Sequence, residues 1–330
     1  MNVNTDLATD APDAGKTSTQ SRVANRWKQM TLAGLGLLAF GVVAAGLYWS
    51  LQPETFDVQA VALERVGEDA SALRSGVIAV STISTVANTL LEKPGGYLRN
   101  DISLPGVYLD NMPSWEYGLI KEVRDSLHAL RNDFSRSQTQ SIEHLDLRKA
   151  DEFLNYDVDS WILPSTESEF REGIESLDRY LDALISADDP SARFFVRADN
   201  LAAYLAVVEK RLGSYAQRLS ASVGDTELTA ALVAEAGQTG PDTVGAEFRP
   251  RTPWLEIDNI FHEARGYSWA LLHMFQALAL EFEPVLRDKN AEVSMQQVIR
   301  DLEEATKRMW SPIVLNGRGF GLVANHSLVL

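Results

Sequence analysis

Residues 34–50, GLGLLAFGVVAAGLYWS, contain no charged side chain, although the 330-residue chain carries a formal net charge of −16. The uncharged stretch extends from Gln29 to Pro53, and residues 30–50 form its apolar centre. A helix of about 20 residues is roughly 30 Å long, which is the thickness of the hydrocarbon core of a bilayer. Residues 30–50 are therefore predicted to form a transmembrane helix, and the lipid bilayer is their expected partner.

The distribution of basic residues predicts the orientation of this helix. Arg22, Arg26 and Lys28 come shortly before it, whereas the first basic residue after it is Arg65. Positively charged residues are retained on the cytoplasmic side of membranes. We therefore expect a single-pass protein with its N-terminus in the cytoplasm and everything beyond residue 50 on the far side.

A cleaved signal peptide is the alternative interpretation, since the small residues 44–46 would suit a cleavage site. The polar leader is long for a signal peptide and the apolar core exceeds a normal signal h-region, so we expect an uncleaved anchor. Gly41 and Ala45 form a small-xxx-small pair, which would allow two spans to approach closely. A homo-oligomer is therefore a further expectation.

Composition excludes several classes of function. The chain has no Cys, so it has no disulfide framework, no zinc–thiolate site and no thiol nucleophile, which suits a bacterial periplasm. Its acidic balance repels phosphates, so no nucleic-acid partner is expected. Residues 1–29 are mostly polar before the basic cluster and predict a disordered cytoplasmic tail.

The region after residue 50 shows helical periodicity almost throughout. The clearest stripe has apolar residues at alternating steps of three and four, which place them on one helix face: Leu201, Leu205, Val208, Leu212, Tyr215 and Leu219. Similar stripes mark helices near 77–92, 120–130, 170–184, 271–285 and 295–309. In one of them, Thr166-x-x-Glu169 has the form of a capping box that begins a helix.

These patterns predict an all-α protein, in which an N-terminal transmembrane helix is followed by an extracytoplasmic antiparallel helical bundle. Residues 51–223 form the first part of the bundle and residues 254–330 the second. Residues 224–253 are rich in Gly, Thr, Ala and Pro, and predict one long loop or a linker between two subdomains.

The stretch Lys93–Glu116, KPGGYLRNDISLPGVYLDNMPSWE, is expected to be non-helical and is the first candidate for a site. Its Asp and Asn side chains could bind a polar or carbohydrate-like ligand against an aromatic wall that includes Tyr108. The same residues also suit an ordered connection in which Asp and Asn form turns, which we favour. The candidate ligand-binding residues are Tyr97, Asn100, Asp101, Asp110, Asn111, Trp115 and Glu116.

Motifs for metals and cofactors are weak. None of the five histidines has a partner at the i, i+4 spacing of a helical zinc site, and Gly266 stands where a second histidine would follow His262-Glu263. The glycines of NGRGFG, residues 316–321, alternate and lack the spacing of a dinucleotide-binding loop. We therefore expect no metal and no cofactor.

Several segments together resemble an uncharacterised bacterial family of single-span membrane proteins, a domain of unknown function. The segments are LLEKPGGYLRNDISLPG, LDNMPSWEYG, RNDFSRSQTQS, SWILPSTESEFREGI, RADNLAAYL, RLGSYAQRLSASVG and LNGRGFGLVANHSL. The resemblance covers most of the region after the predicted span, and it implies a protein of the Gram-negative inner membrane. It implies no catalytic or ligand-binding residue.

Two functional hypotheses follow. The first is a non-enzymatic cell-envelope scaffold or binding protein, held in the inner membrane with its bundle in the periplasm and an envelope protein as partner. The second is a periplasmic enzyme that acts on a cell-wall or sugar substrate through Asp101, Asp110 and Glu116 near the PGGYL loop. Two of these carboxylates would have to converge in a cleft, with one desolvated, for the enzyme hypothesis to gain support.

Overall fold

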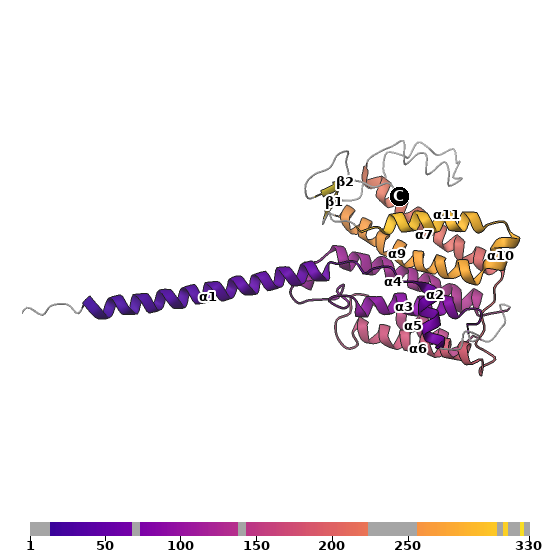
Figure 1. Cartoon of the computed structure of the whole chain (residues 1–330), viewed down its shortest axis with the longest axis horizontal. Helices are drawn as coiled ribbons and strands as arrows, with labels where there is room; N and C mark the ends of the chain where they lie inside the picture. Colours follow the sequence, from indigo (N-terminus) through magenta and orange to yellow (C-terminus); the bar gives the residue numbers. More distant parts are fainter. Residues whose placement is uncertain are drawn as a thin grey trace, which may run out of the picture. The chain divides into compact units, whose positions relative to one another are not determined.

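The structure is a computed structural model, and it is helical (Figure 1). The residues that it describes are 14–67, 73–137, 143–223, 256–308, 313–315 and 324–326. The all-α prediction is confirmed, with one small addition. Two three-residue strands, β1 (Ile313–Leu315) and β2 (Ala324–His326), pair in parallel. The expected linker at 224–253 and the NGRGFG motif lie outside the described residues.

The helices follow the predicted stripes. In chain order they are α1 (Ala14–Trp49), α2 (Val58–Val66), α3 (Val77–Glu92), the 3₁₀ helix η2 (Gly106–Tyr108), α4 (Asn111–Ala129), the π-turn η3 (Leu130–Phe134), α5 (Leu145–Leu154), α6 (Thr166–Ser186), α7 (Ala198–Val223), α9 (Ile257–Glu281), α10 (Glu283–Asp288) and α11 (Glu292–Thr306).

Contacts divide the chain into two units, Met1–Leu47 and Tyr48–Leu330. The first unit contains most of α1, which begins at Ala14 within the segment expected to be a polar tail. From Arg26 to Trp49 this helix is long and apolar enough to cross a membrane, and its side chains there are almost all exposed. The hydroxyl of Thr31 donates to the carbonyls of Trp27 and Lys28, so this polar group is satisfied within the helix.

In the second unit, α4 and α9 pack closely because glycines face the neighbouring backbone. A Cβ atom on Gly118 of α4 would lie 1.8 Å from the carbonyl oxygen of Glu263. A Cβ atom on Gly266 of α9 would lie 1.8 Å from that of Trp115. Only glycine fits at such a distance. Gly266 stands where a zinc motif would need its second histidine, and in the structure it allows α4 and α9 to pack closely.

The other helices cover this central pair. Helix α3 contacts both members of the pair, α6 packs on α3 and α5, and α7 and α11 pack on α9 (Figure 1). Direction can be followed in α5 and α6, where Leu154 lies beside Gly173 and Asp146 binds Arg179. These two helices are antiparallel, as expected for neighbours in a bundle.

Three details of the helix ends differ from the sequence prediction. Helix α4 begins at Asn111, so the expectation that Lys93–Glu116 is non-helical is wrong for its last six residues. Helix α6 is capped by Ser165, whose side chain accepts from the amide of Ser168, rather than by Thr166. The predicted helix 271–285 starts earlier, at Ile257, and breaks at Phe282 just before Pro284.

The carboxylate of Glu281, for which the sequence predicts a solvated helix face, instead caps α3. It accepts hydrogen bonds from the amides of Gly76, Ile78 and Ala79 at 2.9, 3.0 and 3.3 Å. The first amides of a helix have no partner within it, and a carboxylate also favours the positive end of the helix dipole. Glu281 therefore ties the end of α9 to the start of α3.

Residues 51–57, which follow α1 directly, are fixed on α9. The buried Arg265 donates to the side-chain oxygen of Gln52 and to the carbonyls of Ala305 and Lys307 at the end of α11. The amide of Phe56 donates to Nε2 of His273 at 3.1 Å, and the Phe56 ring stacks on the same imidazole. Burial lowers the pKa of His273 to about 4, so the ring is neutral and able to accept.

Candidate functional site

Two loops contain the candidate segment and its neighbours. We call them the loop pair: residues 93–110 between α3 and α4, and residues 155–165 between α5 and α6. Four of the seven sequence candidates, Tyr97, Asn100, Asp101 and Asp110, lie in the first loop. The remaining candidates, Asn111, Trp115 and Glu116, lie at the start of α4.

The Glu116 carboxylate, at the start of α4, is the group around which the first loop folds. The side chains of Glu116 and Lys93 are both fully buried, and Lys93 Nζ lies 2.6 Å from Glu116 Oε1. The amides of Leu98 and Arg99 donate to the same carboxylate at 2.9 and 2.8 Å. Burial raises the pKa of Glu116 and lowers the pKa of Lys93, and each charge opposes the shift of the other. The ion pair and both amides together favour the charged form of the carboxylate.

Two glycines allow the first loop to fold over this ion pair. Gly95 and Gly96 have φ angles of +86° and +69°, a region that side chains disfavour. A Cβ atom on Gly95 would also lie 2.7 Å from Cγ of Trp49, the last residue of α1. The PGG sequence is therefore needed both for the turn and for the close approach of Trp49.

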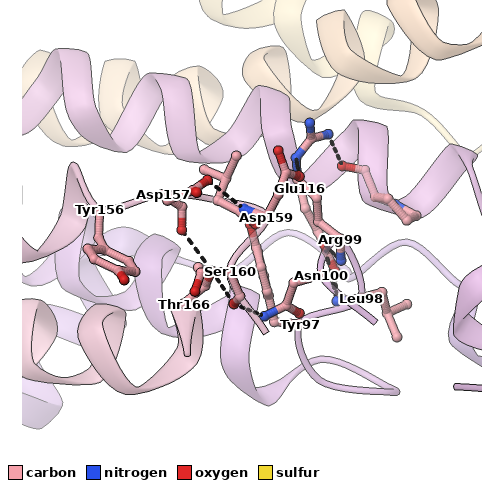
Figure 2. A network of polar contacts seen from close by, with 12 residues as sticks. Tyr97, Leu98, Arg99, Asn100, Glu116, Tyr156, Asp157, Asp159, Ser160 and Thr166 are labelled. Carbon is pink, nitrogen blue, oxygen red and sulfur yellow. Dashed lines mark hydrogen bonds and ion pairs between the residues drawn. The ribbon is translucent and has the colours of Figure 1, made fainter. Parts of the chain in front are cut away.

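Side chains of the first loop reach the second (Figure 2). The Tyr97 hydroxyl donates to the carbonyl of Val158 at 2.9 Å. The amide nitrogen of Asn100 donates to the Ser160 carbonyl at 2.7 Å and to Oε2 of Glu167 at 2.9 Å. Tyr97 and Asn100 are nearly buried, so these bonds are shielded from water and hold the two loops together.

Further contacts stabilise the second loop and connect the first loop to α4 (Figure 2). The Thr166 hydroxyl donates to the Asp157 and Ser160 carbonyls, both within the second loop. Arg99 forms an ion pair with Asp159 at 3.0 Å and lies 4.2 Å from the centre of the Tyr117 ring. The loop pair is therefore linked at several points and forms one connected polar network.

The other sequence candidates lie apart from Glu116. Asp101 accepts hydrogen bonds from the amide and hydroxyl of Ser103, which is a local turn. Asp110 is exposed at the start of α4 and makes no side-chain cap. Asn111 is partly buried in the first turn of that helix. Trp115 is buried and packs against Trp269, with ring centres 5.4 Å apart.

This arrangement bears on both chemical hypotheses. The three carboxylates proposed for catalysis have three different environments: an internal ion pair, a local turn and solvent. The aromatic candidates also separate, since Tyr97 and Trp115 are 5% and 2% exposed whereas Tyr108 is 81% exposed. The polar groups of Tyr97, Asn100 and Glu116 contact the loops themselves.

The loop pair exposes several large apolar side chains. The first loop exposes Ile102, Leu104, Val107 and Tyr108, and the second exposes Trp161, Ile162 and Leu163. The apolar neighbours of Trp161 in the sequence predict a buried ring, but the side chain is 54% exposed.

Residues 52–55 line a pocket of about 460 Å³ together with parts of α9 and α11. Trp269 forms part of its wall, and charges of both signs surround it, with Glu54 and Glu303 against Lys307. Small-molecule sites have volumes of roughly 300–1,000 Å³. Among the described residues, no group of three or more His, Asp and Glu side chains could hold a metal ion.

Comparison with known families places the chain. A model of a family described as "Uncharacterized protein conserved in bacteria (DUF2333)" matches residues 21–330. The chain belongs to this family. No curated protein and no solved structure matches it. The resemblance inferred from the sequence is thus confirmed at the level of the family.

In this DUF2333 member, the helix Arg26–Trp49 is the one candidate membrane span among the described residues. A signal sequence near the N-terminus would share its length and composition. No sequence pattern pointed to the partners of the candidate residues. Lys93 looked like an ordinary loop residue, and Val158 and Glu167 lie more than 50 residues along the chain from Tyr97 and Asn100.

Proposed function

We propose that this DUF2333 protein is held in the bacterial inner membrane by α1, with its N-terminus in the cytoplasm and its bundle in the periplasm. There the bundle acts as a non-enzymatic scaffold or binding protein for another envelope component. Basic residues before the apolar helix and acidic residues after it support this orientation. The exposure of the apolar side chains from Arg26 to Trp49 supports burial in lipid rather than in protein.

The observation that carries the non-enzymatic role is the Lys93–Glu116 ion pair. Glu116 is the most buried of the three candidate carboxylates, and both of its oxygens accept hydrogen bonds from the loop itself. A general acid or nucleophile must reach its substrate. A fully buried carboxylate that binds Lys93, Leu98 and Arg99 supports a role in building the loop rather than in catalysis.

The topology is testable because the chain has no cysteine, so single-cysteine variants label at one position only. Ser18→Cys lies before the span, and Ser214→Cys lies on an exposed position of α7. In intact cells with a permeabilised outer membrane, a membrane-impermeant maleimide should label Ser214→Cys. It should label Ser18→Cys only after the inner membrane is disrupted. The reverse pattern would contradict the proposed orientation.

The role is tested by in-cell crosslinking, followed by assays on wall fragments. A specific crosslinked envelope protein, recovered with the full-length chain, is the expected result. Hydrolysis of wall fragments that is lost in Asp101→Asn and Asp110→Asn variants, with unchanged thermal unfolding, would overturn the non-enzymatic role. Both aspartates are outside the Lys93–Glu116 ion pair, so these variants should fold normally.

A further inference from the structure

The loop pair exposes an unusual amount of apolar surface. We call this surface the apolar rim; its side chains are Ile102, Leu104, Val107, Tyr108, Trp161, Ile162 and Leu163. Among the described residues beyond residue 50, thirteen large hydrophobic side chains are exposed, and seven of them are in the rim. Leu163 and Tyr108 are 90% and 81% exposed. Exposed apolar side chains gathered on two linked loops are typical of an interaction site rather than of scattered exposure.

The two parts of the rim are held side by side. Asn100, two residues before Ile102, donates to the carbonyl of Ser160, the residue before Trp161. The hydroxyl of Ser160 donates to the carbonyl of Pro164, which closes the turn that carries the second part. The buried network beneath therefore presents both groups of side chains on neighbouring loops, in a fixed arrangement.

The rim lies close along the chain to the end of the apolar helix. Trp49, its last residue, packs against Gly95 within the same compact unit as the bundle. An extended chain advances at most about 3.6 Å per residue, so Ile102, the first residue of the rim, lies within about 25 Å of Gly95. If α1 crosses a bilayer, the rim begins within that distance of the point where the chain leaves the lipid.

The chemistry of the rim suits the surface of a bilayer. Trp and Tyr favour the headgroup region, and Ile and Leu favour the acyl boundary below it. Of the charges beside the rim, Arg99 pairs with Asp159, whereas Asp101 keeps its carboxylate charge although Ser103 donates to it.

We propose that the apolar rim docks into the periplasmic face of the bilayer that holds α1, so that the loop pair is a second membrane contact. This inference rests on the membrane anchoring proposed above. Trp161, Leu163 and Tyr108 enter the interface, while the buried network keeps the two loops together as they do so.

Fluorescent probes on single cysteines test the docking. Full-length Leu163→Cys and Tyr108→Cys carry an environment-sensitive nitrobenzoxadiazole label in phosphatidylethanolamine–phosphatidylglycerol vesicles, with or without lipid that carries a nitroxide either at the headgroup or deep in the acyl chain. Leu38→Cys in the span is the control for anchoring. Val293→Cys is the control for a remote surface, since Val293 is 77% exposed and lies 13 residues, about 20 Å, from the end of α11 that Arg265 holds near Gln52.

The expected result is a blue-shifted emission at positions 163 and 108, with severalfold stronger quenching by headgroup-level nitroxide than at position 293. Leu163→Asp should reduce the quenching at position 108, because it adds a charge to the shared surface. Strong quenching at position 38 with none at 163 or 108 would overturn docking alone. No quenching at position 38 would overturn the anchoring and the docking with it. A blue shift that depends on protein concentration and resists lipid nitroxide would assign the rim to a second copy, and would also overturn the proposal.

Discussion

Helix α4 carries two fully buried glutamates, and their surroundings differ. Glu116 contacts Lys93 and two backbone amides of the loop pair. Glu122, six residues along the helix, accepts hydrogen bonds from the hydroxyls of Tyr204 and Ser126, and the Tyr267 hydroxyl also favours its charged form. The Glu116 carboxylate is paired with a cation, whereas the hydrogen-bond donors to Glu122 are neutral hydroxyls.

The difference teaches how each region tolerates a buried acid. An isolated buried charge is costly, so a group without a counterion shifts its pKa and becomes neutral. Burial raises the pKa of Glu122 to about 7, although the Tyr204 and Ser126 hydroxyls oppose the shift. Glu116 instead retains its charge through Lys93. The end of α4 next to the loop pair therefore contains a buried ion pair, whereas the middle of the helix contains a protonated glutamic acid.

The largest effect is expected from Lys93→Met. This change leaves Glu116 buried without a cation, and removing one partner of a buried pair costs about 3–5 kcal/mol of unfolding free energy. Urea unfolding followed by circular dichroism measures the loss. The double variant Lys93→Met, Glu116→Gln should recover most of it, because neither charge remains. A loss below about 1 kcal/mol for the single variant would mean that the pair is not essential to the loop.

Glu122 should make the stability of the protein depend on pH up to about neutral pH. Its pKa in the folded state is about 7, above the ordinary value of 4.5, so the folded protein retains this proton over that range. Its contribution to stability is full below about pH 4.5 and is lost as the pH rises through about 7, by about 3 kcal/mol in total. Unfolding of the wild type and Glu122→Gln at the two ends of this range checks it. Equal pH dependence in both proteins would show that another group is responsible.

Glu281 gives an intermediate case, since it has three amide donors and no cation among its hydrogen-bond partners. Glu281→Ala removes the cap of α3 and should cost about 1–2 kcal/mol of unfolding free energy. Glu283→Ala is the matched control, because its side chain is 59% exposed and pairs with Arg287 on the same helix. If Glu283→Ala lost as much unfolding free energy as Glu281→Ala, the capping carboxylate would stabilise the protein no more than an exposed one.

The smallest effect is expected from Asp159→Ala. Its ion pair with Arg99 joins the two loops, but the Asp159 side chain is 61% exposed. Exposed ion pairs contribute about 0.2–1 kcal/mol, and salt screens them. Unfolding at low and high salt should therefore separate the variant from wild type only slightly. A loss of unfolding free energy comparable to that of Lys93→Met would show that the burial of these contacts does not determine how much they stabilise the protein.

The helices were predictable because their stripes are local. Residues 77–92 form α3 with the expected ends, and the stripe beginning at Leu201 lies in α7. The prediction of individual buried positions was wrong where contacts with other helices determine which side chain is buried. In α7 the buried ring at the centre is Tyr204 rather than Leu205, because Tyr204 reaches Glu122 of α4. In α11 the buried position is Ile299 rather than Val298.

The candidate loop was also recognisable, from its glycines, prolines and Asp and Asn residues. The contacts that these residues make could not be predicted from the sequence. Glu116 belongs to an ion pair because the chain turns back at Gly95 and Gly96, and Asn100 bonds Ser160 because α5 and α6 bring residue 160 alongside. Spacing in one sequence does not encode contacts between residues 60 apart, so the loop pair and its apolar rim appear only in three dimensions.

Infrared spectroscopy at about pH 6 tests the contrast between the two glutamates most directly, because protonated carboxyls and carboxylates absorb at different frequencies. We predict that Glu122→Gln lowers the intensity of the protonated carboxyl band, to which Asp258 also contributes, and that Glu116→Gln leaves it unchanged. Loss of that band in Glu116→Gln, with no change in Glu122→Gln, would contradict the account.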